Sequence, residues 1–75
     1  MQSTQERIAA LTQRAVALSW DGWSPTAILH KLDGRIFAAV KAQGHETCNG
    51  AFLTKEGCAA YCALRNQIAK EITIA

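Results

Sequence analysis

The stretch from Pro25 to Lys41 constrains the fold most, because it places the dipeptide Asp33-Gly34 between two short apolar segments. An Asp-Gly pair in this setting is typical of a two-residue β-hairpin turn, since a type I′ turn needs positive φ at both central residues. The sequence therefore predicts two antiparallel strands that meet at Asp33-Gly34, and a loop of two residues fixes their register.

In this register the side chains of the two strands alternate between two faces. The nearly all-apolar face is expected to pack on the helices and form the core; it contains Leu29, Ile36, Ala38 and Val40. The other face is expected to stay open and mixes apolar with basic side chains: Ile28, His30, Leu32, Arg35, Phe37 and Lys41. An aromatic centre with a basic rim suits a binding surface, since aromatic residues and arginine are enriched at interface hot spots.

The same stretch has a second interpretation as a helix. Its large apolar residues also fit one stripe of an α-helix, and Ser24-Pro25 is a good helix start. In this alternative, residues 24–41 form one helix or a helical hairpin bent at Gly34. The hairpin, which the Asp-Gly pair favours, is the predicted structure.

A helix is predicted on each side of the hairpin. Ser3 followed by Glu6 fits a capping box, and an apolar stripe then indicates a helix from about Thr4 to Leu18. Thr54 is the expected N-cap of the last helix. The apolar stripe of that helix consists of Tyr61, Leu64 and Ile68, flanked by Cys58 and Ile72.

The turn signals Gln43-Gly44 and Asn49-Gly50 lie between these parts. They predict a third, weaker strand from Glu46 to Phe52, with a bulge at Gly50. The predicted fold class is therefore α+β in a single domain, residues 1–75. Its order is helix, three-stranded antiparallel sheet and helix, with both helices on one face of the sheet.

The order of elements resembles the double-stranded-RNA-binding domain, and the likeness covers Arg35 to Ile68. Phe37 matches the position of a strand aromatic in that family, and Gly50, Thr54 and Lys55 fall near its glycine and its lysine-bearing helix start. The resemblance implies an α-β-β-β-α topology and contact with RNA phosphates. The sequence departs from the family at two places. Lys55 stands alone where the family has several lysines, and Leu32-Asp33-Gly34-Arg35 replaces its Gly-Pro-x-His loop.

Composition points to a partner. Charged residues make up 19% of the chain, below the roughly 25% typical of soluble domains, and such a surface often meets another molecule. The predicted partner is another protein, bound through Phe37, Arg35, His30, Lys41 and Trp23. The alternative partner is nucleic acid, bound through Arg35, Lys41 and Lys55. A second copy of the chain is a further candidate partner.

Two tryptophans, Trp20 and Trp23, bracket the turn after the first helix. Either they close the end of a small core, or they anchor a partner. The net charge of +2 neither requires nor excludes nucleic acid.

Cysteine usage and the N-terminal stretch indicate a cytoplasmic protein. The three cysteines are an odd number, the first residues carry no apolar secretory segment, and no segment reaches the ~18 apolar residues of a membrane span. Reduced thiols and no cofactor are expected. The alternative is a small zinc site formed by His45, Cys48, Cys58 and Cys62, although the spacing of the second pair is unusual for zinc.

No pairing of a histidine with a nucleophile and an orienting acid is visible, so the sequence predicts no catalysis. A chain of this size that begins at Met1 suits a small regulator or inhibitor. A phage or mobile-element accessory protein that blocks a host system is one instance.

Overall fold

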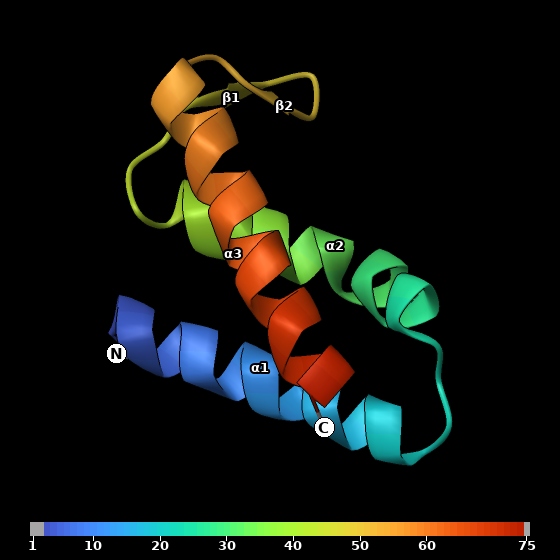
Figure 1. Ribbon diagram of the computed structural model, residues 1–75. Helices are drawn as coiled ribbons and strands as arrows, with labels where there is room; N and C mark the ends of the chain where they lie inside the picture. The colour runs from blue at the N-terminus through green and yellow to red at the C-terminus, as the bar shows by residue number, and fades with distance from the viewer. Residues whose placement is uncertain (1–2, 75) are drawn as a thin grey trace.

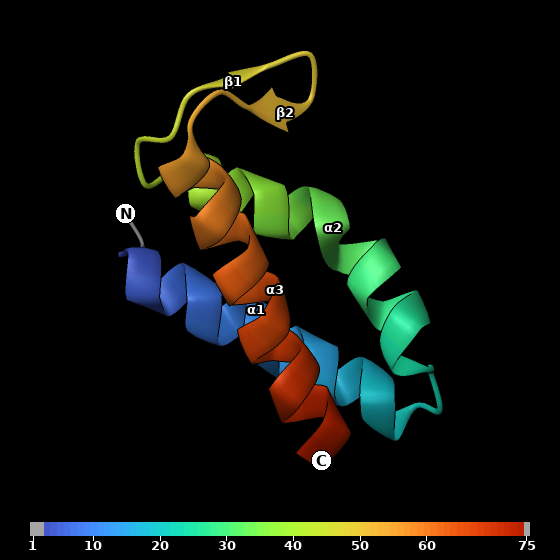
Figure 2. The same ribbon diagram turned by 45° about the horizontal axis from the view of Figure 1, so that its top comes forward.

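The computed structural model describes residues 3–74, and within them three helices surround one core (Figure 1). Helix α1 spans Thr4–Trp20, α2 spans Pro25–Lys41 and α3 spans Lys55–Ile74. Strands β1 (Thr47–Cys48) and β2 (Ala51–Phe52) form a small hairpin between α2 and α3. A short loop joins α1 to α2, which run in opposite directions, and α3 lies across both (Figures 1 and 2).

Each helix begins next to a Ser or Thr whose hydroxyl accepts a hydrogen bond from a backbone N–H three residues later, which satisfies a donor that the helix itself cannot. The predicted starts of the first and last helices are confirmed, and α1 continues two residues beyond the expected end. The hydroxyl and N–H pairs are Ser3 with Glu6 (3.2 Å), Ser24 with Ala27 (3.3 Å) and Thr54 with Gly57 (3.0 Å).

The predicted hairpin at Asp33-Gly34 is wrong, because these two residues lie in the middle of α2. Gly34 does not adopt the positive φ that a type I′ turn requires. The α+β prediction, with three antiparallel strands and both helices on one sheet face, is therefore wrong as well. The helical alternative for residues 24–41, as one helix, is the structure observed.

Burial explains why the helix forms despite its central glycine. A glycine in a helix interior costs roughly 0.5–1 kcal/mol relative to alanine. Burying one large aliphatic side chain contributes about 1.5–3 kcal/mol, and α2 buries a complete stripe of them, while Asp33 and Gly34 remain exposed. The buried residues of α2 are Ile28, Leu29, Leu32, Ile36, Ala39 and Val40.

The change from strand to helix also corrects the predicted core. Leu29, Ile36 and Val40 are buried as expected, but Ala38 is exposed and its neighbour Ala39 is buried instead. Two residues assigned to the open face, Ile28 and Leu32, lie in the centre of the core. The alternation of side chains expected for a strand therefore placed Ala38 in the core and Ile28 and Leu32 on the surface, which is wrong for a helix.

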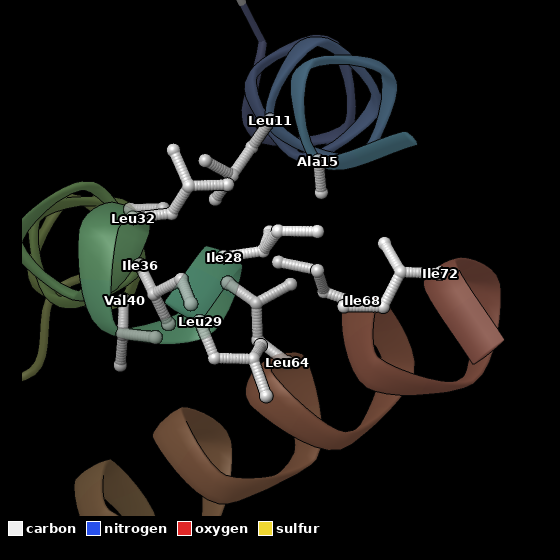
Figure 3. Packing of buried hydrophobic residues seen from close by; sticks show 11 residues of the cluster. Leu11, Ala15, Ile28, Leu29, Leu32, Ile36, Val40, Leu64, Ile68 and Ile72 are labelled. Atoms are coloured by element: carbon white, nitrogen blue, oxygen red, sulfur yellow. The ribbon is translucent and has the colours of Figure 1, made fainter. Parts of the chain in front are cut away.

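The core lies where the three helices meet, and side chains from all three point into it (Figure 3). Leu11 and Ala15 come from α1, and the stripe of α3 supplies Leu64 and Ile68 as predicted, while Tyr61, its third predicted member, is half-buried. Of the expected flanking positions, Ile72 is buried and Cys58 is exposed.

A true two-residue hairpin turn occurs at Asn49-Gly50. Both residues have positive φ, 53° and 80°, as a type I′ turn requires. Thr47 pairs with Phe52 across the two strands, and the Leu53 N–H donates to the Glu46 carbonyl at 3.1 Å. The predicted third strand with a bulge is therefore a self-contained hairpin.

Phe52 attaches this hairpin to the helices. Its ring centroid lies 4.7 Å from that of Phe37 on α2 and 6.1 Å from that of Tyr61 on α3. Gly57 permits the contact with α3, because a Cβ at this position would lie 3.0 Å from the Phe52 Cβ. The hairpin thus covers the end of the bundle where α2 finishes and α3 begins.

A hydrogen bond also ties α3 to α2. The Tyr61 hydroxyl donates to Asp33 Oδ1. This bond, then partial burial and the negative charge of the carboxylate, raise the pKa of Tyr61 above its ordinary value of 10.0. The folded state therefore holds the phenolic proton more tightly than the unfolded state. The resulting stabilisation is complete below pH 10 and is lost as the pH rises through the raised pKa.

Titration of Tyr61 can be measured directly, because it is the only tyrosine in the chain. We expect the phenolate absorbance of the native protein to rise at a pH above 10.0. In Asp33→Ala the midpoint is expected to move down toward that value, since the acceptor and its charge are both removed. A midpoint that is the same in both proteins would contradict the bond.

Candidate binding face

The structure does not assemble the predicted site around Phe37. Phe37 is half-buried against Phe52 and does not stand free. His30 and Lys41 are exposed on the same side of α2 as Phe37, but Arg35 is six residues from Lys41 and so points about 120° away around the helix. The open sheet face predicted for these residues does not exist.

The predicted nucleic-acid residues are likewise not brought together. Arg35 lies on the side of α2 that faces α1, whereas Lys41 projects from the other side near the helix end. Lys55 is the first residue of α3. In the α-β-β-β-α topology implied by the resemblance to the double-stranded-RNA-binding domain, Phe37 would be in a strand, but it is in a helix.

The structure instead groups four cations on the outer side of the α1–α2 pair, and we call this set the basic face: Arg7, Arg14, Lys31 and Arg35. Arg7 and Arg35 line one hollow between the two helices. Arg14 follows Arg7 by seven residues and Lys31 precedes Arg35 by four, so each lies on the same side of its helix as its neighbour. All four side chains are exposed.

The acidic residues of the chain lie mostly elsewhere, so the basic face keeps its positive charge. Asp33 accepts the bond from Tyr61 on the opposite side of α2, and Glu71 lines the groove between α1 and α3. Glu6 is turned by about 100° from Arg7 around α1. Asp21, at the C-cap of α1, is the nearest carboxylate in sequence to the loop end of the basic face.

Trp23 extends the basic face at the loop between α1 and α2. The Lys31 ammonium lies 5.0 Å from the centroid of its ring, within the range of a cation–π contact. Trp23 remains 41% exposed, and Trp20 beside it is 77% exposed. Neither tryptophan closes the core, so the interpretation of Trp23 as a partner anchor stays open and that of Trp20 as a core plug is wrong.

The hollow between Arg7 and Arg35 has a volume of about 380 Å³. Its floor is apolar and made of small side chains together with one leucine: Ala10, Leu11, Ala38 and Ala39. Two guanidinium groups thus flank a shallow apolar surface.

The three cysteines are exposed free thiols. The Cys58 Sγ lies 3.9 Å from the Phe52 carbonyl oxygen, and the His45 ring packs edge-on against Phe52. Among residues 3–74, no group of three or more His, Cys, Asp or Glu side chains is placed to hold a metal ion. The alternative zinc site of His45, Cys48, Cys58 and Cys62 is therefore not assembled in the described chain.

Sequence reasoning missed three members of the basic face: Arg7, Arg14 and Lys31. The spacings of seven residues in α1 and four residues between Lys31 and Arg35 carry the signal. The interpretation of residues 25–41 as strands did not place Lys31 beside Arg35, because four residues along a strand span more than twice the distance they span along a helix.

Comparisons with models of known protein families, with curated proteins and with solved structures give no match for this chain. In the described residues, none of the helices combines the length and apolar character needed to cross a membrane.

Proposed function

We propose that this chain is a small, non-enzymatic binding protein that regulates or inhibits another protein by covering part of its surface. The observation that supports the proposal is the basic face beside the exposed Trp23. Complementary charge steers the encounter with an acidic surface, and a partly exposed aromatic side chain supplies affinity once contact is made.

The cytoplasm is the proposed compartment. Three exposed free thiols in one small chain suit a reducing environment, where they stay unpaired. No side chain is proposed to act in catalysis, and His45 packs against an aromatic ring.

The test compares two variants with the same change of net charge. In Arg14→Glu/Lys31→Glu the basic face is reversed, whereas in Lys55→Glu/Lys70→Glu two exposed lysines of α3 are reversed instead. Each protein is immobilised, incubated with lysate of the cells that express it, either untreated or treated with nuclease, and washed at increasing salt.

The expected result is one or more proteins retained by the wild type and by the α3 variant and lost from the basic-face variant. Equal retention by all three proteins would refute the proposal. Retention that disappears on nuclease treatment would instead support the nucleic-acid alternative, as would affinity that falls linearly in log salt for a duplex probe.

A further inference from the structure

The hollow between Arg7 and Arg35 offers the most specific contact on the basic face. We infer that it binds an acidic amphipathic helix of the partner, with carboxylates on the two arginines and an apolar side chain on the floor between them. This inference rests on the proposed function, since it names the chemistry of the segment that the basic face would recognise.

The composition of the hollow defines the charge pattern of a ligand that fits it. Arg7 from α1 and Arg35 from α2 both line it, and each carries a guanidinium, a planar fork that pairs with carboxylates through two parallel hydrogen bonds. Its floor contains no polar side chain: Ala10, Leu11, Ala38 and Ala39. A ligand that fits must therefore carry charge at its edges and an apolar group at its centre.

Both an acidic peptide and a nucleic acid carry anions that could pair with the two arginines. A nucleic-acid strand would bring phosphates to Arg7 and Arg35, but it would press polar sugar groups on an apolar floor that offers them no side-chain partner. An acidic helix suits both the arginines and the apolar floor. Residues three and four apart lie on one face of a helix, so that face can present charged side chains beside an apolar one. The apolar floor therefore favours an acidic peptide over a nucleic acid as the ligand of the hollow.

The spacing of the cations along α1 and α2 matches intervals of a helical ligand. Arg7 and Arg14 are seven residues apart, which is about 10 Å along α1, and Lys31 and Arg35 are four apart, about 6 Å along α2. A helix with carboxylates at i and i+7 on one side of an apolar residue at i+3, and at i+2 and i+6 on its other side, repeats these two intervals. Two to three helical turns of the partner would cover the basic face from the hollow toward Trp23.

The experiment uses a synthetic helical peptide with Glu at i, i+2, i+6 and i+7 and Leu at i+3, capped at both ends. Two control peptides carry Gln in place of Glu, or the same residues in scrambled order. Binding to the full chain is followed by the fluorescence of its tryptophans and by calorimetry, and a labelled nucleic-acid duplex is titrated in parallel.

Three variants locate the contact. Arg7→Ala/Arg35→Ala removes both guanidinium groups, Ala38→Phe fills the hollow without changing charge, and Lys55→Ala/Lys70→Ala is the matched control on α3. Circular dichroism and thermal melting establish that each variant is folded before binding is compared.

We expect the first two variants to bind the Glu/Leu peptide at least about tenfold more weakly than the wild type, as loss of a hot-spot contact does, and the control to bind it unchanged.

Binding of the scrambled peptide as tightly as the designed one, unchanged binding by both hollow variants, or no binding by the wild type would overturn the inference. A duplex that binds through the hollow in place of the peptide would overturn it too. If these results occur while the capture experiment still depends on Arg14 and Lys31, the proposed function stands and only the assignment of the hollow fails.

Discussion

Leu64→Ala is expected to lower the free energy of unfolding by about 2–5 kcal/mol. Leu64 is only 5% exposed and projects from α3 into the core beside side chains of α2 (Figure 3). Truncation removes apolar contact and leaves a cavity that the surrounding helices fill only in part. In a chain of 75 residues this loss is a large fraction of the total stability.

Leu53→Ala supplies the matched control, since the same chemical change is made at a side chain that is 60% exposed. Its effect is expected to stay within about 0.5 kcal/mol, as for most surface substitutions. Chemical denaturation of both variants measures the difference. Equal midpoints for the two would mean that α3 presents a different face to the core.

The ends of the fold could be predicted because local signals and burial agree there. Ser3 and Thr54 cap helices where a polar residue precedes an apolar stripe, and both caps form. The stripe of α3 has no competing period-2 pattern, so Leu64 and Ile68 were correctly placed in the core.

The middle of the chain could not be settled by local signals, since two templates fit the same residues. The Asp33-Gly34 pair favours a turn, while the stripe from Ile28 to Val40 favours a helix. Tertiary packing decides between them. The apolar stripes of α1 and α3 are covered by a continuous apolar stripe on α2, which only a helix provides. The Tyr61 hydroxyl of α3 then donates a hydrogen bond to Asp33 of α2.

The candidate site depended on this choice more than the core did. Leu29, Ile36 and Val40 are buried under either template, so an error of secondary structure left them in the core. Which surface residues lie together, in contrast, differs between a strand and a helix. Arg35 moves away from Phe37 and toward Arg7 when strand becomes helix, which replaces one candidate surface with another.

Substitutions at Gly34 separate the two structures by the sign of their effect. A Cβ at Gly34 would meet nothing within 4 Å, so Gly34→Ala is expected to stabilise the protein by roughly 0.5–1 kcal/mol through the higher helix propensity of alanine. In a type I′ turn the same change would destabilise, because the turn needs positive φ at that position. Gly50→Ala is the matched control, since Gly50 occupies such a turn at φ 80°, and it is expected to destabilise.

Gly34→Pro is expected to have the larger effect, a loss of about 3 kcal/mol or more. Proline has no N–H to donate to the carbonyl of His30 one turn earlier, and its ring collides with that carbonyl. Thermal and urea unfolding of the three variants, with helix content read by circular dichroism, give the test. A melting temperature that rises in Gly34→Ala and falls steeply in Gly34→Pro requires a continuous α2. A melting temperature that falls as much in Gly34→Ala as in Gly50→Ala would instead indicate a turn at Gly34, and Arg35 would then not belong to the basic face.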